Sequence, residues 1–349
     1  MSLKDLIDDL NVQAVHCEAL GSPFTAQLCR VCAANFNAQG AVQHHICAWP
    51  GDASNRADAM PLRLAGALHA LVLQGRDSGL QAVYPPHKAD DVQLWHAVER
   101  ALDRHASFIL DWLRSPPQTN EVRRATALIP GFHLLAHEIP LPIIATEIGA
   151  SGGLNMGWDQ FALHINAEVW GPAASPVQLT PDWTGPPPPR AKIKVIERAG
   201  CDLNPLNALD VQDNLRLRAY LWADQPDRLV RTEGAMEVQR LHSIPKVARM
   251  DALDFLRARL SAARVGAWHV IYHTIMWQYL PAAAQKAGEA LINAAGKRAT
   301  TEAPLAWLRM EADGEAPGAA ITLTTWPNGH TRTLGRVDFH GRWVNWAGS

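Results

Sequence analysis

The chain has 349 residues, which is enough for one large domain or two ordinary ones with well-buried cores. Hydrophobic residues make up 48% of the chain and charged residues 19%, a balance that excludes a disordered protein. The formal net charge of -2 and the lack of any polybasic run argue against an obligatory nucleic-acid partner and against a protein of the membrane surface.

The N-terminal segment does not resemble a secretory signal, because acidic side chains stand where such a signal has its apolar core. No uncharged apolar stretch approaches the ~20 residues that a membrane-spanning helix needs. We therefore expect a cytoplasmic protein. In that compartment the five cysteines are expected to be reduced: Cys17, Cys29, Cys32, Cys47 and Cys201.

The first 140 residues predict a helical domain. Apolar residues recur at helical spacing over four segments, and Pro- and Gly-containing turns separate these segments. The predicted helices are 26–36, 62–74, 92–114 and 121–137. We expect this domain, residues 1–140, to act as a lid or to lie on the substrate side.

The pattern changes near residue 141, where a short apolar run leads directly into glycines. Strand-like and helix-like segments then alternate, which indicates a largely parallel sheet with helices on its faces. The predicted strands are 143–148, 193–198, 246–250, 268–273, 305–311, 321–326 and 333–339, and the predicted helices are 214–222, 226–241, 252–263 and 281–295. The last two strands are joined by a hairpin signal, Pro327-Asn328-Gly329. The segment 161–190 predicts a hairpin insertion that ends in four prolines.

Seven strands, five of them mostly separated by helices and two in a terminal hairpin, outline the class I methyltransferase fold. The helix usual between strands five and six is reduced here to a loop at 312–319. The predicted fold class is α/β: a Rossmann-like, seven-stranded methyltransferase-type sheet over 141–349, preceded by an all-α domain. Another Rossmann-like sheet is the alternative.

A glycine-rich segment follows the first predicted strand. In such sheets a nucleotide ligand lies across the carboxyl end of this strand, and glycines let the backbone approach it. Glu147 would repel a phosphate but suits a cationic sulfonium ligand that carries an amino group. We expect S-adenosylmethionine as the cofactor, held by Glu147, Gly149, Ser151, Gly153 and Asn155. The alternative is a strand-to-helix turn whose glycines only permit tight packing.

Further acids are expected at the ends of the next two strands. Glu197 and Asp202 are both candidates for the ribose hydroxyls, and Asp202 is preferred because it follows Gly200 at the predicted strand end. Asp202 would alternatively stabilise the turn before the next proline. Asp251 is expected near the adenine amino group, a role compatible with capping the following helix.

The fourth strand ends at His273, a candidate general base near neutral pH, and Glu311 at the end of the fifth strand is a second candidate. Trp277 and Tyr279 are expected to form an apolar or cation-binding wall for the substrate. The alternative for His273 is a histidine satisfied inside a packed loop.

Six short motifs stand out in combination: Ser22-Pro23-Phe24, Gln118 to Val122, Glu147 to Asn155, Arg198 to Pro205, Trp222 to Gln225 with Arg228, and His273 to Tyr279. Together they resemble a bacterial family catalogued as domain of unknown function number twenty-three thirty-two. The resemblance covers nearly the whole chain. It implies a bacterial protein of two parts and no established activity.

The segment that begins at Gln118 is unusually polar for a helix entry. We expect Asn120 and Glu121 to face the crevice and to contact the ligand or acceptor, whereas the alternative is a helix cap. Cys29 and Cys32, followed by His44, His45 and Cys47, would suit zinc. Because the cysteine pair lies inside a predicted helix, no metal site is expected.

The leading hypothesis is an S-adenosylmethionine-dependent methyltransferase that acts on a small-molecule acceptor, with catalysis mostly by alignment of the reactants. The alternative is a non-catalytic nucleotide- or metabolite-binding regulatory protein with a Rossmann-like pocket.

Overall fold

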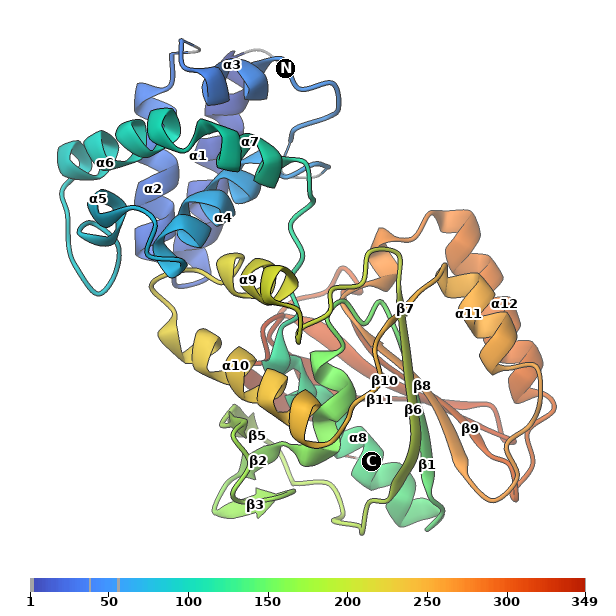
Figure 1. The fold of residues 1–349 in the computed structure, drawn as a ribbon. Helices are drawn as coiled ribbons and strands as arrows, with labels where there is room; N and C mark the ends of the chain where they lie inside the picture. The colour runs from blue at the N-terminus through green and yellow to red at the C-terminus, as the bar shows by residue number, and fades with distance from the viewer. Residues whose placement is uncertain (1–2, 38, 55–56, 349) are drawn as a thin grey trace. The chain divides into compact units, whose positions relative to one another are not determined.

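The computed structural model describes residues 3–37, 39–54 and 57–348. The chain divides into two compact units (Figure 1). Unit 1 is Met1–Thr119 with Val211–Val230, and unit 2 is Asn120–Asp210 with Arg231–Ser349. The division therefore differs from the expected one at residue 140. It falls at residue 119, and a short segment from the second half of the chain belongs to unit 1.

Unit 1 is helical. Its helices are α1 (Leu3–Ala19), α2 (Pro23–Asn35), α3 (Ala41–Cys47), α4 (Met60–Leu73), α5 (Ser78–Gln81), α6 (Asp91–Arg104), α7 (Ala106–Leu113) and α9 (Val211–Ala219). Leu215 and Ala219 of α9 are buried in the same apolar core as Leu64 and Leu68 of α4. This shared core explains why 211–230 belongs to unit 1, since burying these side chains removes apolar surface from water.

The predicted single helix 92–114 is wrong, because it is divided into α6 and α7. A capping box begins α6: the Asp90 carboxylate accepts from the Gln93 N–H, and the Gln93 side chain accepts from the Asp90 N–H. The break is at His105, whose Nε2 lies 2.9 Å from Oδ2 of the buried Asp77. This contact between distant segments takes His105 out of helical geometry.

Two motifs of unit 1 meet at the turn between α1 and α2. The Asp224 carboxylate accepts from the Ser22 hydroxyl at 2.5 Å and from the Phe24 N–H at 2.8 Å. The Gln225 amide donates to the carbonyls of Leu20 and Gly21. These motif residues therefore hold 211–230 against the start of α2.

Unit 2 contains a nine-stranded sheet in the order β5-β12-β11-β10-β9-β8-β1-β6-β7. Its strands are β1 (Ile143–Ile148), β5 (Asp182–Thr184), β6 (Val195–Asp202), β7 (Ala248–Arg249), β8 (Trp268–Thr274), β9 (Leu305–Glu311), β10 (Ala319–Trp326), β11 (His330–Val337) and β12 (Trp343–Trp346). The run from β7 to β9 is parallel, with β1 between β6 and β8. The sheet is thus mixed but mostly parallel.

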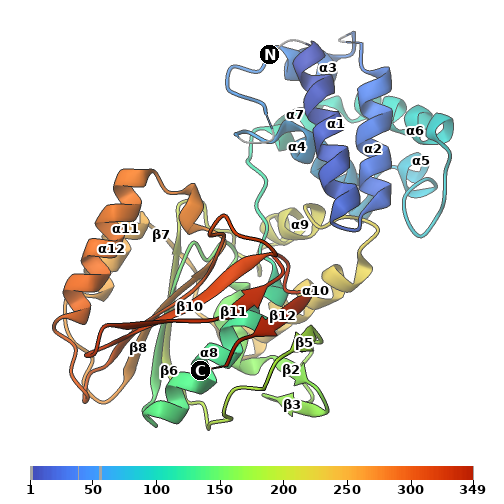
Figure 2. The ribbon, with the colours of Figure 1, turned by 180° about the vertical axis from the view of Figure 1, so that it is seen from behind.

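Helices lie on both faces of this sheet. Helices α11 (Ala252–Arg259) and α12 (Ala282–Gly296) cover one face, and α8 (Ala125–Glu138) covers the other (Figures 1 and 2). Unit 2 also contains the 3-10 helices η1 (Val122–Arg124), η2 (Leu154–Gln160) and η3 (Trp277–Tyr279), and most of α10 (Pro226–Leu241). Within the described ranges, no helix has the length and apolar character needed to cross a membrane.

The expected hairpin insertion is confirmed. Strands β2 (Ala162–Ile165) and β3 (Glu168–Trp170) pair antiparallel, and β4 (Gln178–Leu179) joins them in a small three-stranded sheet. The next strand, β5, instead pairs parallel with β12 at the edge of the large sheet. The predicted seven-stranded sheet is therefore wrong in number. The two added strands have only three and four residues, too few to show a periodicity.

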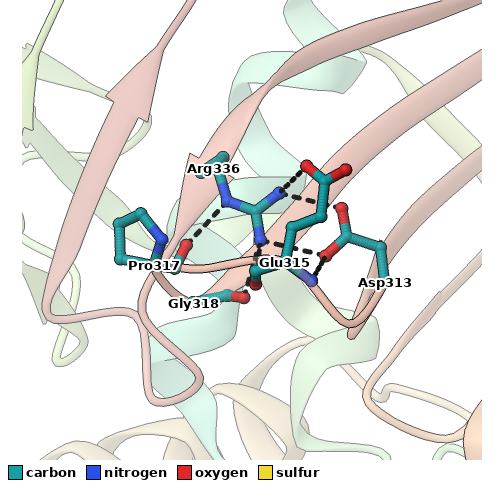
Figure 3. Close-up of polar contacts among 5 residues, drawn as sticks. All are labelled: Asp313, Glu315, Pro317, Gly318 and Arg336. Atoms are coloured by element: carbon teal, nitrogen blue, oxygen red, sulfur yellow. Dashed lines mark hydrogen bonds and ion pairs between the residues drawn. The ribbon is translucent and has the colours of Figure 1, made fainter.

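The loop between β9 and β10 determines how the sheet ends. Because this loop is too short for a crossover helix, β10 returns antiparallel to β9, and β11 and β12 continue the meander. Arg336 of β11 holds the loop together (Figure 3). Its guanidinium donates to both carboxylate oxygens of Asp313 and to the carbonyls of Glu315, Pro317 and Gly318.

Candidate functional site at the carboxyl edge of the parallel strands

The predicted glycine loop lies at the point where the strand order reverses. From β1 the chain goes to β6 and β7 on one side and later to β8 and β9 on the other. Ligands of open α/β sheets bind at such a switch point, outside the carboxyl ends of the strands. All six residues of β1 are buried, and the loop starts directly after Ile148.

The loop needs its glycines for backbone geometry and for packing. Gly149 and Gly153 have φ values of +66° and +72°, and Ser151 also lies in the left-handed region at +53°. A Cβ on Gly149 would come within 2.9 Å of the Met276 side chain. The loop continues into the 3-10 helix η2. The tight-packing alternative thus describes part of what these glycines do.

Asn120 and Glu121 lie beside this loop. The Asn120 side chain accepts from the Leu154 N–H at 2.9 Å, so that it caps η2, and the Asn155 amide donates to the Glu121 carbonyl at 3.1 Å. Both Asn120 and Glu121 are buried, and the Glu121 carboxylate accepts from the Arg123 N–H. These contacts bring the polar helix entry and the glycine motif together. They also give the two residues a structural part in the loop.

Two of the predicted acids, Asp202 and Asp251, lie at the ends of β6 and β7, as the sequence analysis expects. Asp202 accepts from the N–H groups of Ser151 and Asn204, at 2.9 and 2.8 Å. Asp251 caps α11 by accepting from the Leu253 N–H at 2.8 Å. Asp202 therefore stabilises a turn, and Asp251 the start of a helix, at the candidate site.

Glu197 is the less suitable of the two candidates for a ribose contact. It lies in the middle of β6 and forms ion pairs with Arg259 and Arg264. Although burial acts to raise the pKa of Glu197, its hydrogen bonds to the two arginines hold the pKa below its usual value. Its carboxylate is thus engaged by arginines of α11 and of the segment after it, whereas Asp202 stands at the strand end.

Glu147 is buried in an aromatic environment. Its carboxyl group accepts from the Tyr272 hydroxyl at 3.3 Å, and the Tyr272 ring meets Phe132 edge-on. Burial raises the pKa of Glu147 to about 8; the Tyr272 hydrogen bond opposes this shift, and the negative charge of Asp202 adds to it. At neutral pH the carboxyl group is therefore mostly protonated. Perturbed acids of this kind are common at functional sites.

His273 and Glu311 form one hydrogen-bonded unit with Trp307. The indole N–H of Trp307 donates to Nε2 of His273 at 3.0 Å, so Nε2 is an acceptor and the proton of the neutral ring is on Nδ1. Nδ1 lies 2.6 Å from Oε1 of Glu311. His273 is fully buried, and both of its nitrogens are engaged. This arrangement matches the alternative of a satisfied histidine and leaves no free lone pair for a base.

Glu311 also holds the end of β8. Its Oε1 accepts from the backbone N–H groups of Met276 and Trp277 at 3.0 and 3.2 Å. Burial acts to raise the pKa of Glu311, but the hydrogen bond from His273 and the two backbone hydrogen bonds together lower it. Its buried Oε2 has no hydrogen-bond partner among the residues that the structure describes.

Only one of the two predicted wall residues joins the site. Trp277 stacks on His273 with 5.0 Å between ring centroids. Tyr279 is 76% exposed and points away from this packing. The site also contains four residues that were not predicted: Tyr272, Met276, Trp307 and Arg124. The Arg124 guanidinium donates to the Thr274 carbonyl. The alternation of the strand at 268–273 could have shown that Tyr272 faces opposite to His273.

Four of the five cysteines belong to unit 1, whereas Cys201 precedes Asp202 at the end of β6. All five are free, and Cys29 and Cys32 are buried inside α2. Burial raises the pKa of Cys32 to about 12. Among the described residues, no group of three or more His, Cys, Asp or Glu side chains is arranged to hold a metal ion.

The fold and this edge define a Rossmann-like α/β protein with an added helical unit. A comparison with protein-family models matches residues 8–346 to the family described as "Uncharacterized protein conserved in bacteria (DUF2332)". The chain belongs to this family, as its motifs indicated. Searches of curated proteins and of solved structures found no significant match.

Proposed function

We propose that the protein is an S-adenosylmethionine-dependent methyltransferase acting on a small molecule. The observation that carries the proposal is the glycine loop at the switch point of the sheet, with Glu147, Asp202 and Asp251 at the ends of three neighbouring strands. Acids in these places suit the ammonium and hydroxyl groups of such a ligand. When bound, the cofactor supplies an electrophilic methyl group on a positively charged sulfur.

Two buried polar atoms in the loop support a fit to this group. The Ser151 hydroxyl and the Asn155 amide oxygen have no hydrogen-bond partner within the described residues. Buried polar groups are rarely left unsatisfied, so a ligand with hydroxyl and amino groups would complete them. A cationic ligand close to Glu147 would also favour the ionised carboxylate, which the burial of the side chain disfavours.

The residues of the chain would act mainly by binding and orientation. Gly149 and Gly153 would bring the backbone close to the ligand, and Asp202 would take the ribose end. Alignment of the methyl group with the acceptor can supply a large part of the acceleration without a base. This matters because both nitrogens of His273 are engaged in hydrogen bonds.

The same engagement of His273 favours the second candidate, a non-catalytic protein that binds a nucleotide or metabolite at this edge. The two candidates differ in turnover alone. Purified protein, incubated with methyl-labelled S-adenosylmethionine and a bacterial metabolite extract, should convert the cofactor to S-adenosylhomocysteine and label an extract component. Binding of both compounds without any conversion would favour the regulatory protein, and absence of binding of either compound would contradict the methyltransferase.

A further inference from the structure

Unit 2 contains a cavity that the candidate site does not use. Its volume is about 280 Å³, close to the lower end of the range for small-molecule sites, roughly 300–1,000 Å³. Helix α8, η2, the end of β3 and the segment before β6 form its walls. The small sheet lies next to α8 in this part of unit 2 (Figures 1 and 2). None of the loop residues 149–153, all of them described, lines it.

Three polar groups in the cavity wall are hydrogen-bond donors. The first is His133, which is buried and accepts from the Ala191 N–H through Nδ1 at 3.2 Å. Burial lowers the pKa of His133 to about 4, so the ring is neutral at pH 7 and its proton is on Nε2. No described residue accepts from this Nε2–H.

The second donor is the indole of Trp158. The side chain is 1% exposed, and its Nε1 has no hydrogen-bond partner within the part of the chain that the structure describes. Its ring position is well defined, because it stacks on Phe132 with 3.8 Å between centroids. A buried N–H without a partner costs free energy, which an acceptor inside the cavity would recover.

The third donor is the Arg190 guanidinium, which donates to the Val169 carbonyl at 3.0 Å and carries a full positive charge. The acid in the wall, Asp159, is held by Arg198, which donates to both of its oxygens at 2.6 and 3.1 Å. The charge of Asp159 is thus balanced within the protein. Arg190 therefore gives the cavity a positive character.

The rest of the wall is apolar and includes Ile129, Phe161, Pro172 and Ile193. A ligand that fits must be small and apolar at one end, and at the other end it must accept several hydrogen bonds from donors, one of them cationic. We propose that this cavity binds a small carboxylate with an apolar body, such as an arylalkanoic acid. The proposal does not depend on the proposed function, because it concerns other residues.

Calorimetry on the full chain tests this proposal with phenylacetate and with 2-phenylethanol, its uncharged counterpart. We expect one phenylacetate site per chain, with affinity at least tenfold higher than for 2-phenylethanol, since hydrogen bonds to charged groups are stronger than neutral ones. Arg190→Met should weaken phenylacetate binding about tenfold. Lys192→Met is the matched control, because Lys192 is exposed nearby but does not line the cavity, and it should bind normally.

A second variant tests the location of the site. Ala191→Trp places a whole indole ring at the cavity wall and should block phenylacetate binding while the melting temperature shows a folded protein. If this variant does not fold, the comparison of Arg190→Met with Lys192→Met still decides. Absence of heat up to about 10 mM phenylacetate, equal affinity for the two probes, or equal binding by Arg190→Met and Lys192→Met would each overturn the proposal.

Discussion

Glu147 at the end of β1 should make the stability of unit 2 fall as the pH rises. Burial, with a smaller contribution from Asp202, raises its pKa from 4.5 to about 8. Between these two values the folded protein keeps the proton that the unfolded chain has lost. The stability due to this proton is fully present below pH 4.5 and is lost as the pH rises through 8.

The substitution Glu147→Gln keeps the size of the side chain and removes its titration. With the two pKa values above, ionisation of the wild-type carboxyl group lowers the free energy of unfolding by roughly 1 kcal/mol at pH 5 and by roughly 4 kcal/mol at pH 8. The glutamine variant should therefore become more stable, relative to the wild type, by roughly 3 to 4 kcal/mol between these pH values.

Urea unfolding of both proteins at pH 5 and pH 8 measures this difference, because groups that both proteins share cancel in the subtraction. Glu168→Gln, an exposed change on β3, is the matched control and should differ from the wild type equally at both pH values. A difference between Glu147→Gln and the wild type that stays the same at pH 5 and pH 8 would refute the reasoning.

Three further predictions concern the same edge of the sheet. Gly149→Ala should lower the free energy of unfolding in urea by roughly 2–3 kcal/mol, and Gly266→Ala by only roughly 1 kcal/mol. Both glycines have positive φ, but only at Gly149 would the added Cβ meet a side chain. Equal losses of stability in the two variants would contradict the packing argument. Nitrogen-15 spectra should show the ring proton of His273 on Nδ1, whereas a proton on Nε2 would exclude the Trp307 bond. Because Glu147 should ionise beside a cation, affinity for S-adenosylmethionine should rise roughly tenfold from pH 6 to pH 8. This rise should exceed any rise for S-adenosylhomocysteine, which lacks the positive charge on sulfur. Equal pH dependence of the two affinities in calorimetry would place Glu147 away from the sulfonium.

Long elements with clear boundaries could be predicted from the sequence. The bounds of β1, β9 and α10 are confirmed at both ends, because each is a continuous apolar or amphipathic segment between turn signals. The short strands β5 and β12 could not be predicted, since β5 depends on pairing with the distant β12, and β12 on pairing with both β5 and β11. The return of 211–230 to unit 1 and the helix break at His105 likewise depend on contacts between distant residues.

The candidate site shows the same limit. The positions of the glycine loop and of Asp202 follow from the rule that parallel strands present their carboxyl ends at one edge. The partners of these residues depend instead on strand register, which opposes Glu147 to Tyr272 on the neighbouring strand. The Trp307 bond that engages His273 likewise joins two strands, so the sequence alone left open whether His273 is a base or a satisfied histidine.

A structure of the protein crystallised with excess S-adenosylhomocysteine tests the central claim most directly. We predict ligand density along the glycine loop, with the backbone of Gly149 to Gly153 in contact with it and the ribose hydroxyls at Asp202. Density for the ligand at any other place, or a loop that stays without ligand at saturating concentration, would contradict the claim that this edge of the sheet is the functional site.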